Sequence, residues 1–272
     1  MNVQQYPVVP EAAAERMVLG RMVLKIEDSG MAVSEGMATY GEVSGKEAHL
    51  PAAPDENPFQ SGNGANGFYL SKSRLNRYIS CPRSYLLHYD LGVVPLRPDR
   101  ELLIGRSTHR LIAAHHLARK KEAFVDANAV LDDFWTRYTR EDEAPDARRE
   151  MEAARTESLR YAQLFIRDVP LDPLEIERDF SLPLVNLENG DTLPVPLVGV
   201  IDLVDQPNGV LRPLEIKTRA RKADAWQVRV ALELTCYAWW VRQRIMETGT
   251  REPEEIPVGY VNIIKTKTPT IQ

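Results

Sequence analysis

The spacing of the hydrophobic positions changes once along the chain, close to residue 174. Before that point apolar residues recur three or four positions apart, which is typical of amphipathic helices. The pattern predicts two short helical pieces within 71–92, a helix of about six turns from residue 101, and helices over 126–138 and 146–167. Pro82 suits the start of the second short piece, and Gly92 suits its end.

After residue 174 apolar and polar positions alternate, which is typical of β-strands. Strands are predicted over 174–187, 193–204 and 209–217, a helix over 225–246, and a last strand over 256–266. This order of elements favours an α/β domain. We expect a small mixed β-sheet flanked by helices, with a helical N-terminal portion.

Residues 1–66 differ from the rest of the chain. Their periodicity is weak, and they end in a stretch rich in Pro, Gly and Asn, which is typical of a linker. We therefore expect a poorly ordered N-terminal extension and linker over 1–66 and a folded domain over 67–272. The chain stops soon after the last predicted strand, where such a domain usually continues into a covering helix. A truncated C-terminus is one interpretation.

The composition indicates a soluble globular domain, with 43% hydrophobic residues and a formal net charge of −5. This overall charge does not point to a nucleic-acid binder. No apolar run approaches the roughly 18 residues of a membrane helix, and the N-terminus lacks a secretory signal pattern. Two cysteines, Cys81 and Cys236, do not form a disulfide framework. We therefore expect a reducing, cytoplasmic location without membrane association.

The most informative stretch is 198–218, in which two apolar runs flank a short polar turn. Asp202 lies in the first run. Glu215 and Lys217 lie in the second and share one strand face, while Ile216 points to the opposite face. If the runs pair as a hairpin, the two carboxylates and the lysine suit a hard divalent cation and a nucleophilic water, with the Ile216 carbonyl as a further candidate ligand. The alternative is a hairpin whose charges are merely exposed.

A basic stretch follows this candidate site over 212–229. Its residues Arg219, Arg221 and Lys222 are candidates for contacts with phosphate groups. The alternative is a solvated loop followed by the start of a helix.

Further candidates lie on other predicted elements. His109 falls within a helix and could complete a metal site, although a lone helical histidine is more often structural. Glu177 lies on the strand that precedes the site and is either a further ligand or an exposed acid. Glu233 and Tyr237 are four residues apart on a helix, so they share a face and could contact DNA beside the site.

Five ordered segments together resemble the PD-(D/E)XK nuclease superfamily, in its RecB-type branch. They are LSKSRLNRYISCPRSYLLHY, GRSTHRLI, GVIDLVD, LEIKT and ELTCYA, and they extend from Leu70 to about Lys265. These segments are similar to the family's S-x-S-x-L-x-x-Y-x-x-C-P-x-x-Y opening, its G-x-x-x-H helix, its G-x-x-D strand, its (D/E)-x-K-T strand and its Q-L-x-x-Y-A helix. The resemblance implies a restriction-endonuclease-like core.

The resemblance also implies roles for individual residues. The implied metal ligands are His109, Asp202, Glu215 and the backbone carbonyl of Ile216, with Glu177 as an additional acid. The implied catalytic set is Asp202, Glu215, Lys217, Glu233 and Tyr237. The implied metal is Mg²⁺ or Mn²⁺, and Tyr237 would also support the DNA together with the basic residues after the site.

Two positions depart from the family pattern. The family has a glutamine where this chain has Glu233, and a carboxylate cannot donate a hydrogen bond unless it is protonated. Branches with an iron–sulfur cluster use a cysteine like Cys81 plus three near the C-terminus. With only Cys81 and Cys236, this chain cannot assemble such a cluster alone. Cys81 is then either an orphan ligand or a buried small residue.

These patterns lead to one main functional hypothesis and two alternatives. We predict a Mg²⁺- or Mn²⁺-dependent deoxyribonuclease and, by the resemblance alone, an exonuclease in DNA recombination, repair, phage replication or CRISPR-type processing. DNA is the expected partner, and a helicase or recombination protein is a candidate second partner. The alternatives are a non-catalytic DNA-binding or scaffolding module with the same fold, or a nuclease subunit active only beside a helicase.

Overall fold

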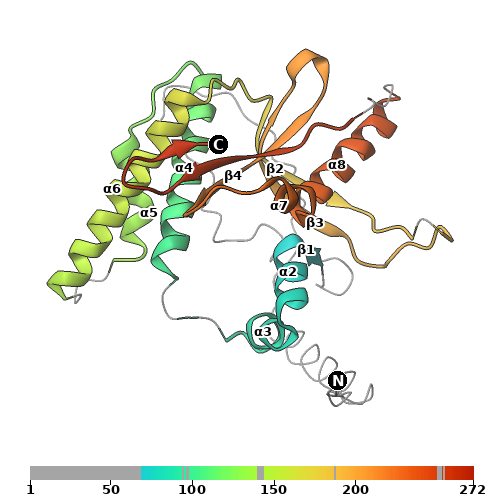
Figure 1. Cartoon of the computed structure of the whole chain (residues 1–272), viewed down its shortest axis with the longest axis horizontal. Coiled ribbons are helices and arrows are strands. Elements are labelled where there is room, and N and C mark those ends of the chain that lie inside the picture. The colour runs from blue at the N-terminus through green and yellow to red at the C-terminus, as the bar shows by residue number, and fades with distance from the viewer. Residues whose placement is uncertain are drawn as a thin grey trace, which may run out of the picture. The chain divides into compact units, whose positions relative to one another are not determined.

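The structure places one small mixed β-sheet between two sets of helices. It is a computed structural model that describes residues 69–93, 95, 98–139, 144–186, 188–249, 253 and 255–272. The extension predicted over 1–66 lies outside these residues. Figure 1 shows the sheet with α4, α5 and α6 on one side and α8 on the other. The α/β class and the flanked mixed sheet are confirmed.

The helices are α2 (Lys72–Ser80), α3 (Pro82–Tyr85), α4 (Arg100–Lys120), α5 (Ala127–Thr136), α6 (Pro145–Asp168), α7 (Ala225–Arg229) and α8 (Leu232–Thr248). A π-helical turn, η1, covers Leu86–Asp90, and a 3-10 turn, η2, covers Pro207–Gly209. The strands are β1 (Leu70–Ser71), β2 (Glu175–Leu182), β3 (Leu197–Asp205), β4 (Arg212–Arg219), β5 (Gly259–Ile264) and β6 (Thr270–Ile271).

Strand β3 organises the sheet because it has neighbours along both edges. One edge pairs antiparallel with β2 over most of its length. The other edge is shared: β1 pairs parallel with it at Leu197 and Val198, and β4 pairs antiparallel with it from Leu203 to Asp205. Strand β5 then pairs parallel with β4, and β6 antiparallel with β5. Within the described part of the chain, residues 199–202 of β3 therefore have no paired strand on this second edge.

Each face of the sheet contributes to its own hydrophobic core. The first core joins α4, α5 and α6 to side chains of β4 and β5 such as Ile216 and Ile263. The second joins α8 to β2 and β3 through residues such as Tyr237, Trp240 and Phe180. Ile216 belongs to the first core, so Glu215 and Lys217 point toward the α8 side, as strand alternation predicts.

The sheet face toward which the side chains of β2 and β3 point changes at one cross-strand position. Ile201 packs in the α8-side core and Leu203 in the opposite core, although residues two apart in a regular strand share a face. Glu177 lies opposite Asp202 in the register and has a backbone φ of 49°, which is rare for a residue other than glycine. The irregularity thus places Asp202 where groups from both faces can reach it.

Prolines account for two of the differences between predicted and observed strand boundaries. Strand β2 ends at Leu182, before Pro183, and β3 begins at Leu197, after Pro196. Proline has no N–H to donate to a ladder, so the predicted strands 174–187 and 193–204 were each too long at one end. The two-residue strands β1 and β6 were missed, because so short a segment has no readable period.

The helix predicted over 225–246 is divided in two. Asp224 and Gln227 form a capping box that begins α7, which stops at Arg229. Ala231 then takes an extended conformation, and α8 begins at Leu232. The interruption places a new helix N-terminus, with Glu233 in its first turn, beside the candidate site.

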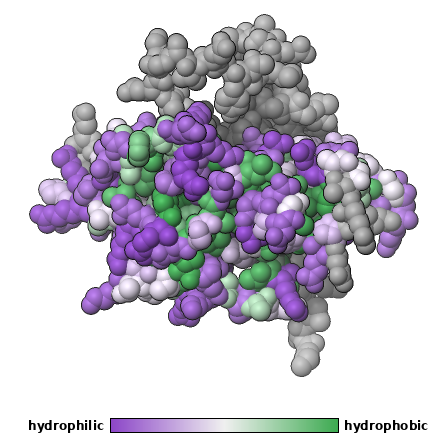
Figure 2. Space-filling model, turned by 90° about the horizontal axis from the view of Figure 1, so that it is seen from above, coloured by the Kyte–Doolittle hydropathy of each residue, from purple (hydrophilic) through white to green (hydrophobic). Residues whose placement is uncertain are grey.

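The surface in Figure 2 is a patchwork of hydrophilic and hydrophobic areas. None of the helices in the described residues has the length and apolar character needed to cross a membrane.

His116 is a buried titratable group within the helical layer. It lies on α4 against Phe165, is 3% exposed, and has no hydrogen-bond partner at either ring nitrogen within the described residues. Burial lowers the pKa of His116 to about 4, and the nearby charges of His115 and Arg119 add to this effect.

We predict that His116 makes the domain sensitive to acid. Because the folded-state pKa is depressed, the unfolded chain takes up the proton first, and stability falls as pH drops from about 6.5 toward 4. When the pH falls from 8 to 5, the protonation of His116 in the unfolded chain should lower the unfolding free energy by about 2 kcal/mol. Urea unfolding of wild type and His116→Leu at both pH values measures this. A stability difference between the two proteins that does not change with pH would contradict the assignment.

Candidate metal-dependent nuclease site

The candidate site lies where β3 and β4 separate. Beyond the Leu203–Leu214 pair the ladder between them stops. The Ile216 N–H donates instead to Oδ2 of Asp202 at 2.7 Å, so a side chain occupies the place of a strand partner. A residue's N–H and C=O point to the same edge of a strand, so the Ile216 carbonyl also faces this gap.

Asp202 is contacted from the α4 side of the sheet by His109. The distance between Nδ1 of His109 and Oδ1 of Asp202 is 3.5 Å, and both side chains are largely buried, at 23% and 13% exposed. Burial raises the pKa of Asp202, but the His109 ring, Lys72 and the Ile216 N–H outweigh it and hold this pKa below its usual value. Burial lowers the pKa of His109, but the carboxylates of Asp202, Glu177 and Glu215 outweigh it and raise this pKa. The two side chains therefore favour each other's charged forms.

Glu177 lies close enough to Asp202 and His109 for their charges to change its pKa. Burial, followed by the negative charges of Asp202 and Glu215, raises the pKa of Glu177 to about 8. Its left-handed backbone is a strained conformation that the surrounding strands maintain. Glu177 thus shows that negative charge is crowded in the site, which is what a bound cation would relieve.

Glu215 has both of its oxygens engaged from the α8 side. Oε2 accepts a hydrogen bond from the hydroxyl of Tyr237, and Oε1 contacts the ammonium groups of Lys217 and Lys72. The Tyr237 oxygen also lies 3.0 Å from the carbonyl of Val200, on the unpaired edge of β3. Burial and the charge of Glu215 raise the pKa of Tyr237, so its hydroxyl stays protonated and able to donate.

Lys72 is a member of the site that the sequence reasoning missed. Its Nζ lies 2.6 Å from Oε1 of Glu215 and 3.2 Å from the Tyr237 hydroxyl. The residue stands between the two serines of the SKS segment, at the start of α2, where a lysine by itself suggests an exposed helix end. Only the parallel pairing of β1 with β3 brings that helix end to the gap, and no short-range pattern reveals such a pairing.

Glu233 contacts the lysine of the site. Its Oε1 lies 3.5 Å from Nζ of Lys217, and it accepts a hydrogen bond from the Tyr260 hydroxyl. Burial raises the pKa of Glu233, but hydrogen bonding at the start of α8, Lys217 and Tyr260 lower it below its usual value. Burial lowers the pKa of Lys217, and Glu215, Glu233 and Asp202 more than offset this. Both side chains are therefore charged near neutral pH.

The three basic residues that are candidates for phosphate contacts lie at the end of β4 and just after it. Arg219 is its last residue, with the guanidinium 4.8 Å from the ring centre of Tyr260. Arg221 and Lys222 lie exposed in the connection to α7. They are thus on the chain segment that leaves the site, while their contacts with DNA remain a prediction.

The two cysteines have different surroundings. Cys236 is buried on α8, and Cys81 is exposed between α2 and α3. The expectation that Cys81, unless it is a ligand, is a buried small residue is therefore wrong. Cys81 belongs to neither of the two cores.

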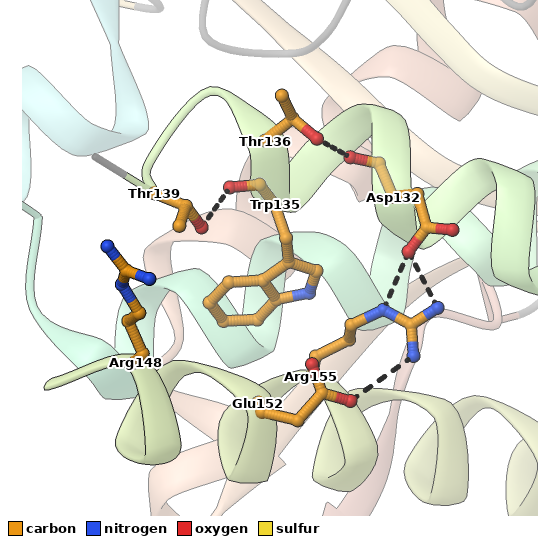
Figure 3. Close-up of a pocket in the computed structure, with 7 residues that line it drawn as sticks. All are labelled: Asp132, Trp135, Thr136, Thr139, Arg148, Glu152 and Arg155. Carbon is orange, nitrogen blue, oxygen red and sulfur yellow. Dashed lines mark hydrogen bonds and ion pairs between the residues drawn. The ribbon is translucent and has the colours of Figure 1, made fainter. Parts of the chain in front are cut away.

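A cavity of about 870 Å³ lies away from these groups, between α5 and α6. Figure 3 shows Trp135 at its centre, with Arg155 paired to Asp132 and Glu152 along one wall. None of the candidate catalytic side chains lines it. The site lies instead where the pairing of β3 with β4 stops.

The donor set suits a hard cation, but its present arrangement does not hold one. Carboxylate and carbonyl oxygens of Asp202, Glu215 and Ile216 are ligands that Mg²⁺ and Mn²⁺ prefer. In the described residues, however, no three carboxylate, imidazole or thiol groups surround a common point. Glu215 is turned to Lys72 and Lys217, so it must exchange an ammonium partner for the ion. The residues fit the metal once that exchange occurs.

These observations define the class of protein. A mixed sheet between helices carries two acids and a lysine at the point where two central strands separate. The family model for the PD-(D/E)XK nuclease superfamily matches residues 69–272, which is three-quarters of the sequence. The chain belongs to this superfamily. No protein of curated function matches it. The RecB-type branch stays a prediction within the family.

Gly105 lies on the face of α4 that approaches Thr218 of β4. A side-chain carbon there would lie 3.3 Å from Oγ1 of Thr218, which is tighter than an ordinary contact. Gly105 is one helical turn before His109 on the same face. We predict that Gly105→Val forces α4 outward and lowers the unfolding free energy by about 1–3 kcal/mol. Urea denaturation measures the loss.

Thr218→Ala in the Gly105→Val background is the internal control. It removes the hydroxyl that faces the new side chain, so part of the lost stability should return. Equal losses with and without Thr218→Ala would show that the glycine is not needed for this close approach.

Tyr237→Phe tests the support of Glu215. The variant keeps the ring in the α8-side core but removes the donor to Oε2, which leaves a buried carboxylate oxygen without its partner. We predict a loss of about 1–3 kcal/mol in unfolding free energy at pH 7. Chemical denaturation of the variant beside Tyr78→Phe, at an exposed tyrosine, provides the comparison. A loss no larger than that of Tyr78→Phe would contradict a special role.

Proposed function

We propose that this protein is a Mg²⁺- or Mn²⁺-dependent deoxyribonuclease. The observation that carries the proposal is the convergence of Asp202, Glu215 and Lys217 at the gap between β3 and β4, with the Ile216 carbonyl directed into it. Membership of a nuclease superfamily supports the same reading.

In the proposed reaction, water attacks the phosphorus of a phosphodiester, one P–O ester bond breaks, and the products are a phosphate monoester and a hydroxyl group. A divalent cation supplies charge neutralisation at the phosphate and lowers the pKa of the attacking water. Asp202, Glu215 and the Ile216 carbonyl would hold the ion, with His109 supporting Asp202 from the α4 side. These groups come from β3, β4 and α4, so their spacing depends on the packed fold.

Lys217 supplies the positive charge beside the reacting phosphate. Its raised pKa keeps it protonated, so it orients the water and stabilises negative charge that develops in the transition state. Glu233 holds the ammonium from the first turn of α8 and leaves it next to Glu215. Glu233 would therefore position the lysine. This role explains why a carboxylate can stand where the family has a glutamine.

Exonuclease action and a role in recombination, repair, phage replication or CRISPR-type processing form the narrower part of the proposal. They rest on the resemblance of the motifs to the RecB-type branch. Arg219, Arg221 and Lys222 would hold the DNA backbone, which makes binding weaken as salt rises.

The test is a cleavage assay on end-labelled single- and double-stranded DNA with Mg²⁺ or Mn²⁺, with and without chelator. We expect cleavage that stops with chelator and falls at least about 100-fold in Asp202→Asn and in Lys217→Met. Asp146→Asn, at an exposed acid on α6, is the matched control and should cleave like wild type. Circular DNA separates the two modes, because only an endonuclease cuts it.

Full cleavage activity in Asp202→Asn would contradict this mechanism.

The rival function is a DNA-binding module without turnover. The observation that favours it is the contact of Glu215 with two lysines. It predicts DNA binding with no cleavage in any metal. Cleavage that begins only when a helicase is added would instead indicate a subunit of a larger nuclease.

A further inference from the structure

Two ammonium groups share one oxygen of the buried Glu215. Lys217 reaches Oε1 from two residues away on β4, while Lys72 reaches it at 2.6 Å from α2, far away in the sequence. Tyr237 already satisfies the other oxygen. Each buried oxygen of Glu215 would therefore have a donor without Lys72, so the requirement that buried polar groups be paired does not explain this lysine.

The backbone fixes the position of Lys72. Strand β1 runs parallel to β3, with Leu70 and Ser71 in register with Leu197 and Val198. The residue after β1 therefore follows at the level where the unpaired edge of β3 begins. The Ser71 side chain accepts a hydrogen bond from the Arg74 N–H at 3.3 Å and starts α2 at this point. Lys72 is thus the first helical residue above the gap.

Lys72 also has access to solvent. Its side chain is 23% exposed, whereas that of Glu215 is 4% exposed. Part of the lysine side chain is therefore accessible from outside the molecule, while the carboxylate that it contacts is almost fully covered.

We propose that Lys72 is a second phosphate-binding lysine, which neutralises Glu215 in the metal-free protein and turns to the DNA backbone when a divalent cation takes its place. This inference rests on the proposed nuclease function. It assigns the N-terminal helical segment a part in substrate binding at the site. A cation and an ammonium compete for Oε1, so Lys72 opposes cation binding and supports cleavage.

The two effects have opposite signs, which a purely structural ion pair would not produce. Replacing Lys72 by methionine removes the competing charge, so Mn²⁺ should bind roughly tenfold more tightly in the absence of DNA. The same change removes a phosphate ligand, so cleavage under saturating Mn²⁺ should slow about 100-fold. Lys72→Arg keeps the charge, so its Mn²⁺ affinity should stay near that of wild type and it should recover part of the cleavage rate.

The experiment uses the full chain in four forms: wild type, Lys72→Met, Lys72→Arg and Lys121→Met. Lys121 is an exposed lysine at the end of α4, and its replacement should change neither quantity. Isothermal titration with Mn²⁺ alone gives the cation affinity. Single-turnover cleavage gives the rate, and DNA affinity in Ca²⁺ gives binding under conditions chosen to slow the reaction. Thermal melting reports whether each variant is folded.

Each result has a defined meaning. Tighter Mn²⁺ binding together with slower cleavage and weaker DNA binding supports the proposal. Unchanged or weaker Mn²⁺ binding in a folded Lys72→Met protein overturns it, and so does an unchanged cleavage rate. If wild type itself cleaves no DNA, the proposed function fails, while the Mn²⁺ and DNA affinities of Lys72→Met still decide the role of this lysine.

Discussion

The hydrogen bond from the Ile216 amide to Asp202 joins β3 and β4 just after their ladder has stopped. A side chain there takes the place of a neighbouring backbone, so two central strands separate without leaving a buried N–H unpaired. The same bond orients the carboxylate and directs the Ile216 carbonyl into the gap. The other groups of the site are arranged around this opening, because a continuous ladder would leave no room for an ion or a phosphate.

Several elements supply the groups around the opening. Helix α4 approaches from one face with His109, and the close contact at Gly105 permits that approach. On the other face, α8 contributes Tyr237 and Glu233, and α2 contributes a lysine. The change of facing opposite Glu177 explains how one aspartate serves both sides. Strain in the strands is thus concentrated at the position where chemistry is proposed.

The electrostatic balance of the site is the second constraint. Acids outnumber lysines, and burial, together with the charges of Asp202 and Glu215, raises the pKa of Glu177. Two lysines meet this charge in the protein without metal, and they do so on the same oxygen of Glu215. Under the proposed function, metal binding is an exchange of cations in a crowded acidic site. This explains why the donor set suits a hard cation although its present arrangement does not surround one.

The sequence by itself determined the α/β class, most element centres, and the grouping of Glu215 with Lys217, because these depend on period and on residues close in the chain. It also carried the family motifs. The tertiary structure decided the rest: the separation of β3 from β4, the break between α7 and α8, the exposure of Cys81, and the arrival of Lys72 at Glu215. Those features depend on contacts between residues far apart in the chain, which no local pattern encodes, since a lysine at a helix start looks the same in sequence whether it faces water or a buried carboxylate.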